Sequence, residues 1–282
     1  MSKTLAAALV LLAYGLSTAE ASKHSRASGD DGAHWIGPAQ GRARLIVGRI
    51  AMPAGATRTL AGIHIALAPG WKTYWRIPGD SGMPPAFDWS RSSNLARAEI
   101  LYPAPARLPE GGMESIGYSS DVVFPLEISA ENPDQPMRLV IDVEFGVCKD
   151  ICMPVSGTLS VTLPGANEEH GPLIAAHLAR VPLAAKPGDA AIKDVRVVRK
   201  KDRRMLVIAA SFPTVDGSGD LFLDDPEGGP APLTRRLDQT GGRFEADLGP
   251  PGDWARLNGK KLRATLVSSQ GQCWTLITLP AQ

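Results

Sequence analysis

The sequence predicts an all-β protein made of two immunoglobulin-like β-sandwich domains, which a short helix and a linker join. Short runs in which apolar and polar residues alternate recur along most of the chain, and such runs are typical of half-buried strands. Clusters of turn-forming residues separate the runs, in agreement with a content of 29 Gly and 24 Pro in 282 residues. Hydrophobic residues make up 44% of the chain, which is enough for a packed core and excludes a wholly disordered protein.

The charge balance narrows the range of partners. The chain carries 30 Lys and Arg residues against 29 Asp and Glu residues, so its formal net charge is +1. A protein that binds nucleic acid needs an excess of basic residues to neutralise phosphates. We therefore expect no nucleic-acid partner.

The N-terminal residues predict a signal peptide over 1–21. Lys3 supplies a positive charge, residues 5–16 are apolar or small almost throughout, and residues 19–21 form the small-x-small pattern that precedes a cleavage site. The apolar run is far shorter than the span of about 20 residues that a transmembrane helix needs. We expect an exported mature chain without a transmembrane segment, beginning with a disordered leader over residues 22–37.

The first sandwich is predicted over residues 38–165. Within the run 59–67, the apolar residues Ile63 and Ile65 alternate with residues such as His64, which sets one face of a strand toward a core. Turn clusters lie at 78–80, 103–109 and 132–136. The strands expected in this domain are 44–50, 59–67, 96–101, 122–128, 139–147 and 155–163.

Residues 166–190 are predicted to form the short helix and the linker. The helix is expected over 171–180, with Pro172 at a tolerated position in the first turn and Pro182 just beyond the end. Residues 191–282 then form the second sandwich, because seven strands in about 90 residues match an immunoglobulin-like domain in size. These strands are expected at 195–198, 205–211, 220–223, 233–237, 243–248, 262–267 and 274–279.

Cys148 and Cys152 lie in the connection between two predicted strands and are the candidate catalytic residues. A disulfide across three intervening residues closes a small ring, and loop-closure entropy gives such a ring only about 2 kcal/mol of stabilisation. Strain in a short ring also makes a disulfide easier to reduce. The spacing favours a redox pair, and it leaves open a structural disulfide or a metal site.

The metal alternative uses the same segment. Cys148, Cys152 and Met153 offer soft sulfur ligands that suit Cu(I), whereas no second pair of Cys or His completes a zinc site by spacing. The third cysteine, Cys273, lies in a predicted strand of the second sandwich, and we interpret it as a buried thiol without a part in the chemistry. On the primary hypothesis the protein needs no cofactor and no metal.

Five stretches of the sequence, taken in order, resemble a known family. Together they resemble the N-terminal periplasmic domain of the DsbD thiol:disulfide interchange proteins, and within that family they are more similar to the branch around ScsB. The resemblance covers residues 40–165 strongly and extends more loosely toward the end of the chain. The stretches are GWKTYWR at 70–76, PGDSGMPP at 78–85, ESIGY at 114–118, FPL at 124–126 and the Cys148/Cys152 segment with Pro154.

The resemblance implies a role for each site residue. Cys148 and Cys152 would be the redox pair, with Cys152 forming mixed disulfides and Cys148 resolving them. A cap loop at about 113–119 would cover the pair through Ile116 or Tyr118. Tyr74 and Trp75 would form an adjacent wall, although ordinary core packing explains all four of these side chains equally well.

The resemblance also implies partners and a compartment. The chain would work in the periplasm, between a membrane-embedded thiol reductase of the DsbD/CcdA type and oxidised proteins with a thioredoxin fold. We expect it to lack the transmembrane electron-transfer domain and the C-terminal thioredoxin-like domain of the full-length family, and its cysteine spacer is shorter. We therefore expect a thiol–disulfide exchange module, as a component of a protein-disulfide reductase. The alternatives are a copper-binding or copper-tolerance protein and a non-catalytic binding sandwich with a structural disulfide.

Overall fold

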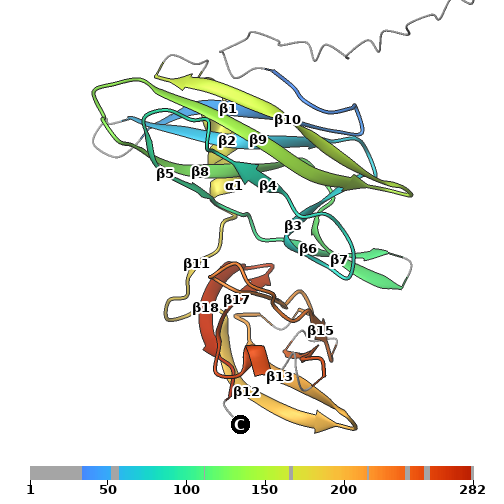
Figure 1. Ribbon diagram of the computed structural model, residues 1–282. Helices are drawn as coiled ribbons and strands as arrows, with labels where there is room; N and C mark the ends of the chain where they lie inside the picture. Colours follow the sequence, from blue (N-terminus) through green and yellow to red (C-terminus); the bar gives the residue numbers. More distant parts are fainter. Residues whose placement is uncertain are drawn as a thin grey trace, which may run out of the picture.

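The computed structural model describes residues 34–51, 57–110, 112–164, 168–214, 216–238, 242–250 and 255–280. The chain is mostly β, and the strands of these residues form four sheets that stack in two pairs, one pair in each half of the chain (Figure 1). The all-β prediction is confirmed. The predicted signal peptide and nearly all of the predicted leader lie outside the described residues. No helix among the described ranges has the length and apolar content to cross a membrane.

The first pair of sheets holds the N-terminal half of the chain. One sheet has the order β1-β2-β8-β5, and the other has the order β10-β9-β3-β7-β6 with the short β4 beside β9. Every pairing in the two sheets is antiparallel. The strands are β1 (Gly41–Ala51), β2 (Thr57–Leu67), β3 (Lys72–Gly79), β4 (Ala86–Asp88), β5 (Leu95–Ile100), β6 (Ala106–Glu110), β7 (Met113–Tyr118), β8 (Val122–Ala130), β9 (Met137–Cys148) and β10 (Cys152–Leu163).

The core of this pair lies between the two sheets. Ile63 and Ile65 of β2 are fully buried there, together with Phe124 of β8 and Phe145 of β9. The alternation that predicted β2 therefore holds, because side chains of successive residues point to opposite faces of a sheet. Burying such a side chain stabilises the fold by about 1.5–3 kcal/mol.

The predicted helix is α1 (Gly171–Leu178), and it packs on the outer face of the first pair of sheets rather than between the two halves. Ile174 of α1 contacts Ile46, Leu60 and Val123, which lie on the faces of β1, β2 and β8 that point away from the main core. A Cβ atom on Gly48 would lie 2.0 Å from the backbone N of Gly171. The two glycines therefore allow the start of the helix to lie directly on β1.

The second pair of sheets holds the C-terminal half. Its sheets have the orders β12-β13-β16-β15 and β11-β18-β17-β14, and their core includes Leu206, Leu223, Phe244 and Leu266. Part of the predicted linker is itself a strand, since β11 (Leu183–Ala184) pairs in parallel with β18. The other strands are β12 (Ala191–Lys200), β13 (Arg203–Ser211), β14 (Asp220–Asp224), β15 (Thr234–Arg236), β16 (Arg243–Asp247), β17 (Lys261–Ser268) and β18 (Gly271–Thr278).

Each strand expected from the sequence has a counterpart, but four strands of the first half were not predicted. They are β3, β4, β6 and β7. Pro and Gly occur at 78–79 and within 103–112, and both residues are typical of turns. For this reason the sequence pattern did not predict a strand at the end of β3 or in the β6–β7 hairpin.

The two halves meet at β3, β6 and β7, which lie at the end of the first half that faces the second (Figure 1). Phe222 of β14 is fully buried and belongs to the core cluster of the first half. Its ring meets that of Trp75 in β3 edge to face, with 5.9 Å between the ring centroids. Apolar packing is therefore continuous from one half of the described chain to the other.

Candidate functional site

The site begins with the hairpin that β9 and β10 form. Cys148 is the last residue of β9, Cys152 is the first of β10, and the two are directly opposite in the register. Their Cα atoms are 4.1 Å apart, and a disulfide joins their sulfur atoms. Directly opposite residues of antiparallel strands have Cα atoms about 4.5–5.5 Å apart. The strand register by itself therefore brings the two cysteines within reach of a disulfide.

The two cysteines differ in exposure. Cys148 is buried, with 1% of its surface exposed, and its strand β9 lies between β10 and β3 in the sheet. Cys152 is exposed, and the neighbouring Ile151 at the tip of the hairpin is 71% exposed. Cys152 is therefore the more accessible of the two residues.

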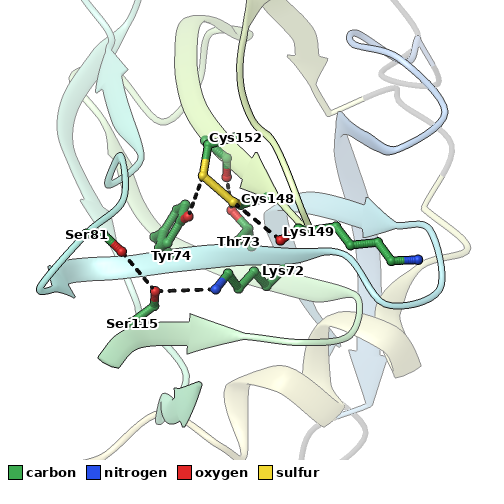
Figure 2. The surroundings of a disulfide bond; sticks show 9 residues. Lys72, Thr73, Tyr74, Ser81, Ser115, Cys148, Lys149 and Cys152 are labelled. Carbon is green, nitrogen blue, oxygen red and sulfur yellow. Dashed lines mark hydrogen bonds between the residues drawn. A yellow bond between two sulfur atoms is a disulfide. The ribbon is translucent and has the colours of Figure 1, made fainter. Parts of the chain in front are cut away.

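Tyr74 lies against the exposed sulfur. Its hydroxyl oxygen is 3.6 Å from Sγ of Cys152 (Figure 2). A sulfur atom in a disulfide carries no hydrogen, so the hydroxyl is the donor. Lys72 pairs with Cys148 in the register, and Tyr74 lies two residues further along β3, so all three share one face of the sheet. The structure thus brings Tyr74, but not the next residue, to the disulfide.

Trp75 points to the opposite face of β3. It is 1% exposed and lies in the core, against Phe222 of the second half. The guanidinium of Arg76 stacks on its indole ring at 4.2 Å from the ring centroid. Trp75 therefore packs the interior and does not border the disulfide.

Ile116 and Tyr118 were expected over the cysteine pair, and the structure places both in the core instead. Tyr118 pairs with Thr73, so it shares the inner face of the sheet, and its hydroxyl donates to the carbonyl oxygen of Pro103 at 2.8 Å. Burial raises the pKa of Tyr118 well above its usual value. The residue of β7 that faces Tyr74 is Gly117, which has no side chain to extend over the disulfide.

The segment that covers Tyr74 is the loop between β3 and β4. We call residues 80–85 the covering loop. Gly82 has φ +121°, and a Cβ atom there would lie 2.3 Å from the ring of Tyr74. The carbonyl oxygen of Met83 accepts a hydrogen bond of 3.2 Å from the backbone N of Gly146 in β9. The loop lies within the sequence motif PGDSGMPP at residues 78–85.

Polar contacts connect the covering loop to the sheet around the cysteines. Oγ of Ser115 is 3.4 Å from Oγ of Ser81 and accepts from Nζ of Lys72 at 3.5 Å (Figure 2). The hydroxyl of Thr73 donates to the carbonyl oxygen of Gly146 at 2.8 Å. These bonds join β3, β7, β9 and the loop into one layer behind the disulfide.

Met153 does not gather with the two cysteines as a third sulfur ligand. It pairs with Val147, so it shares the inner face, and its side chain packs against the core. Among the described residues no group of three or more His, Cys, Asp or Glu side chains is arranged to hold a metal ion. The set of Cys148, Cys152 and Met153 that would suit Cu(I) is thus divided between two faces of the sheet.

Cys273 is a free, buried thiol in β18, as expected from the sequence. Its Sγ donates to the carbonyl oxygen of Ala190 at 3.4 Å. Burial raises the pKa of this thiol, which lowers its reactivity. Cys273 belongs to the second half of the chain and takes no part in the site.

Comparison with known proteins agrees with these features. Residues 43–164 match the family model described as the N-terminal part of thiol:disulfide interchange protein DsbD. The structure is similar to the crystal structure of the N-terminal periplasmic domain of ScsB from Proteus mirabilis, with a TM-score of 0.63. That similarity extends over 88% of this chain and 98% of the ScsB domain at 21% sequence identity, and it shows a shared fold. No curated protein matches the sequence significantly. The resemblance to the N-terminal domain of DsbD that the sequence motifs predicted is thus confirmed for residues 43–164.

Proposed function

We propose that the protein is a periplasmic thiol–disulfide exchange module. It would relay reducing equivalents from a membrane-embedded thiol reductase to oxidised periplasmic proteins through Cys148 and Cys152. One observation carries the proposal: a disulfide between one buried and one exposed cysteine lies at a hairpin tip, within the segment that matches the DsbD family. The family match supports thiol redox partners in general.

The proposal includes a division of the chain into parts. A signal peptide at 1–21 would direct export, and 22–37 would be a leader. Residues 38–165 would be the DsbD-like sandwich, and 191–282 would be a second immunoglobulin-like sandwich. The separate sheet pairs support this division, and α1 and β11 fall in the connection at 166–190.

The exchange would proceed in two balanced steps. In the reduced protein, the thiolate of Cys152 attacks one sulfur of the partner's disulfide, a mixed disulfide forms, and the partner's other sulfur leaves as a thiolate and takes up a proton. The thiolate of Cys148 then attacks Sγ of Cys152, and the partner's second sulfur leaves. The protein is oxidised by two electrons, the partner is reduced by two, and a dithiol of the membrane reductase reverses the change in the protein.

The different exposures of the two cysteines support this order of events. An incoming disulfide reaches the exposed Cys152, while the buried Cys148 attacks only within the protein. Tyr74 would donate its hydroxyl hydrogen to the sulfur of Cys152 in the thiolate form, as it does in the disulfide. A hydrogen bond to a charged group contributes about 1.5–3 kcal/mol, so the bond would favour the reactive thiolate.

Trapping of mixed disulfides tests the proposal. In a Cys148→Ser variant the resolving thiol is absent, so Cys152 should remain joined to periplasmic thioredoxin-fold proteins, which non-reducing electrophoresis and mass spectrometry identify. The Cys152→Ser variant is the matched control and should trap far less, because Cys148 is buried. Equal trapping by both variants, or none by the first, would contradict the proposal.

A further inference from the structure

We propose that the second half of the chain positions the redox site, by holding the covering loop closed through an ion pair between Arg235 and Asp80. Arg235 lies in β15 of the second half, and Asp80 is the first residue of the loop. Both are positioning residues, since neither contacts the disulfide. The inference rests on the proposed thiol–disulfide exchange, but its consequences are measured without a protein partner.

The ion pair connects the second half directly to the loop. Nη2 of Arg235 donates to both carboxylate oxygens of Asp80, at 3.1 and 3.2 Å. The backbone N of Asp80 also donates to the carbonyl oxygen of Glu114 at 2.8 Å, and the backbone N of Glu114 donates back to the Asp80 carboxylate at 3.0 Å. Asp80 thus links β15 of the second half to β7 of the first.

A more deeply buried cluster holds β7 from the other side. The side chain of Arg107 in β6 is 10% exposed, and its Nε donates to both carboxylate oxygens of Asp220 in β14 at 3.0 Å. The same guanidinium donates to the Glu114 carboxylate at 3.0 Å and to the carbonyl oxygen of Leu221 at 3.1 Å. Removal of one partner would leave the other charge buried and unpaired, which is strongly unfavourable. The β6–β7 hairpin, which carries Glu114, is therefore held in a fixed position where it contacts Asp80.

The second half also contacts β3 beside Tyr74. Arg76 donates to the Asp224 carboxylate at 2.9 Å, and Trp75 packs on Phe222. The strand that carries Tyr74 is thus held on its inner face directly after that residue. The second half fixes both β3 and the beginning of the covering loop.

Two further contacts connect Asp80 to Sγ of Cys152. Asp80 is two residues from Gly82, whose backbone lies on the Tyr74 ring, and the Tyr74 hydroxyl lies 3.6 Å from Sγ of Cys152. When the loop is fixed, it confines the ring beside the sulfur. Release of Asp80 would let the loop and the ring move, so a thiol would reach Cys152 more easily.

The test compares Arg235→Ala with the unchanged protein in the rate at which dithiothreitol reduces the Cys148–Cys152 disulfide. An exposed ion pair contributes up to about 1 kcal/mol, so we expect reduction to be faster by about two- to fivefold. Amide hydrogen exchange in residues 80–83 should become faster as well. Arg235→Lys should restore most of the slow rate, and Asp80→Asn should match Arg235→Ala, with no added effect in the double variant.

A matched control removes an exposed ion pair elsewhere. Arg97 pairs with Glu99 in β5, on the sheet that does not carry the disulfide, and Arg97→Ala should leave both measurements unchanged. Unchanged reduction and unchanged hydrogen exchange in Arg235→Ala would overturn the inference. Failure of Cys148→Ser to trap partners, combined with faster reduction of Arg235→Ala, would instead refute the exchange function and retain the positioning role.

Discussion

At the scale of single residues, the site depends on which face of a strand each side chain occupies. Tyr74 and Trp75 are adjacent in the sequence, and one lies on the disulfide while the other fills the core. Likewise Cys152 points outward and Met153 inward. The sequence motifs identify the segments that form the site. Side chains alternate between the two faces of a strand, so an error of one residue places a side chain on the wrong face.

Removal of the Tyr74 hydroxyl should weaken the nucleophile. In the reduced Tyr74→Phe protein, the thiolate of Cys152 loses its hydrogen-bond donor, so we expect alkylation by iodoacetamide at neutral pH to be slower by about tenfold. The rate is measured by mass spectrometry. Tyr102→Phe is the control, since Tyr102 packs on Phe124 and no hydrogen bond joins it to Cys152. An equal or faster rate in Tyr74→Phe would show that the hydroxyl does not stabilise the thiolate.

At the scale of elements, the β3–β4 connection lies on Tyr74 beside the disulfide, whereas the cover was expected at residues 113–119. Strand β7 cannot supply the cover, because Gly117 faces Tyr74 while Ile116 and Tyr118 are required in the core. The covering loop takes that place because Gly82 allows its backbone to lie directly on the Tyr74 ring. Glycine is suited to this position because it has no Cβ atom and adopts a positive φ without strain.

Substitution of Gly82 should therefore destabilise the loop. In Gly82→Ala the new Cβ atom meets the Tyr74 ring, and the φ of +121° is unfavourable for alanine, so we expect a loss of about 1–3 kcal/mol in the free energy of unfolding. Urea denaturation measures the loss. Gly188→Ala is the control, because Gly188 also has a positive φ, of +100°, but no heavy atom lies within 4 Å of its Cβ position. The difference between the two variants isolates the contact with Tyr74, and equal losses would show that this contact is unimportant.

At the scale of the whole molecule, the two halves share apolar packing and charge pairs. Phe222 belongs to β14 of the second half yet lies in the core of the first, and Arg107, Arg76 and Arg235 connect the halves through three aspartates. We expect the halves to unfold together, since separation would expose Phe222 and leave buried charges without partners.

Truncation of Phe222 tests this coupling. Phe222→Ala should cost about 3–5 kcal/mol and divide a single calorimetric unfolding transition into two, because each half retains its own core. Phe212→Ala is the matched control. Its ring packs on Phe244 within the second half. Its loss should therefore lower the stability of the protein but leave a single unfolding transition, because the contact between the halves is intact. Two transitions already present in the unchanged protein would contradict the coupling.

The sequence by itself determined the all-β class, the positions of the regularly alternating strands, the short helix, the family of residues 43–164 and the cysteine pair. Alternation, turn residues and motif order are local features, so they can be read along the chain. Only the tertiary structure decided which cysteine is exposed, that Tyr74 and not Trp75 lies at the disulfide, and that Arg235 of the second half pairs with Asp80 of the covering loop. These depend on sheet register and on contacts between residues as many as 155 positions apart, and no local pattern encodes them.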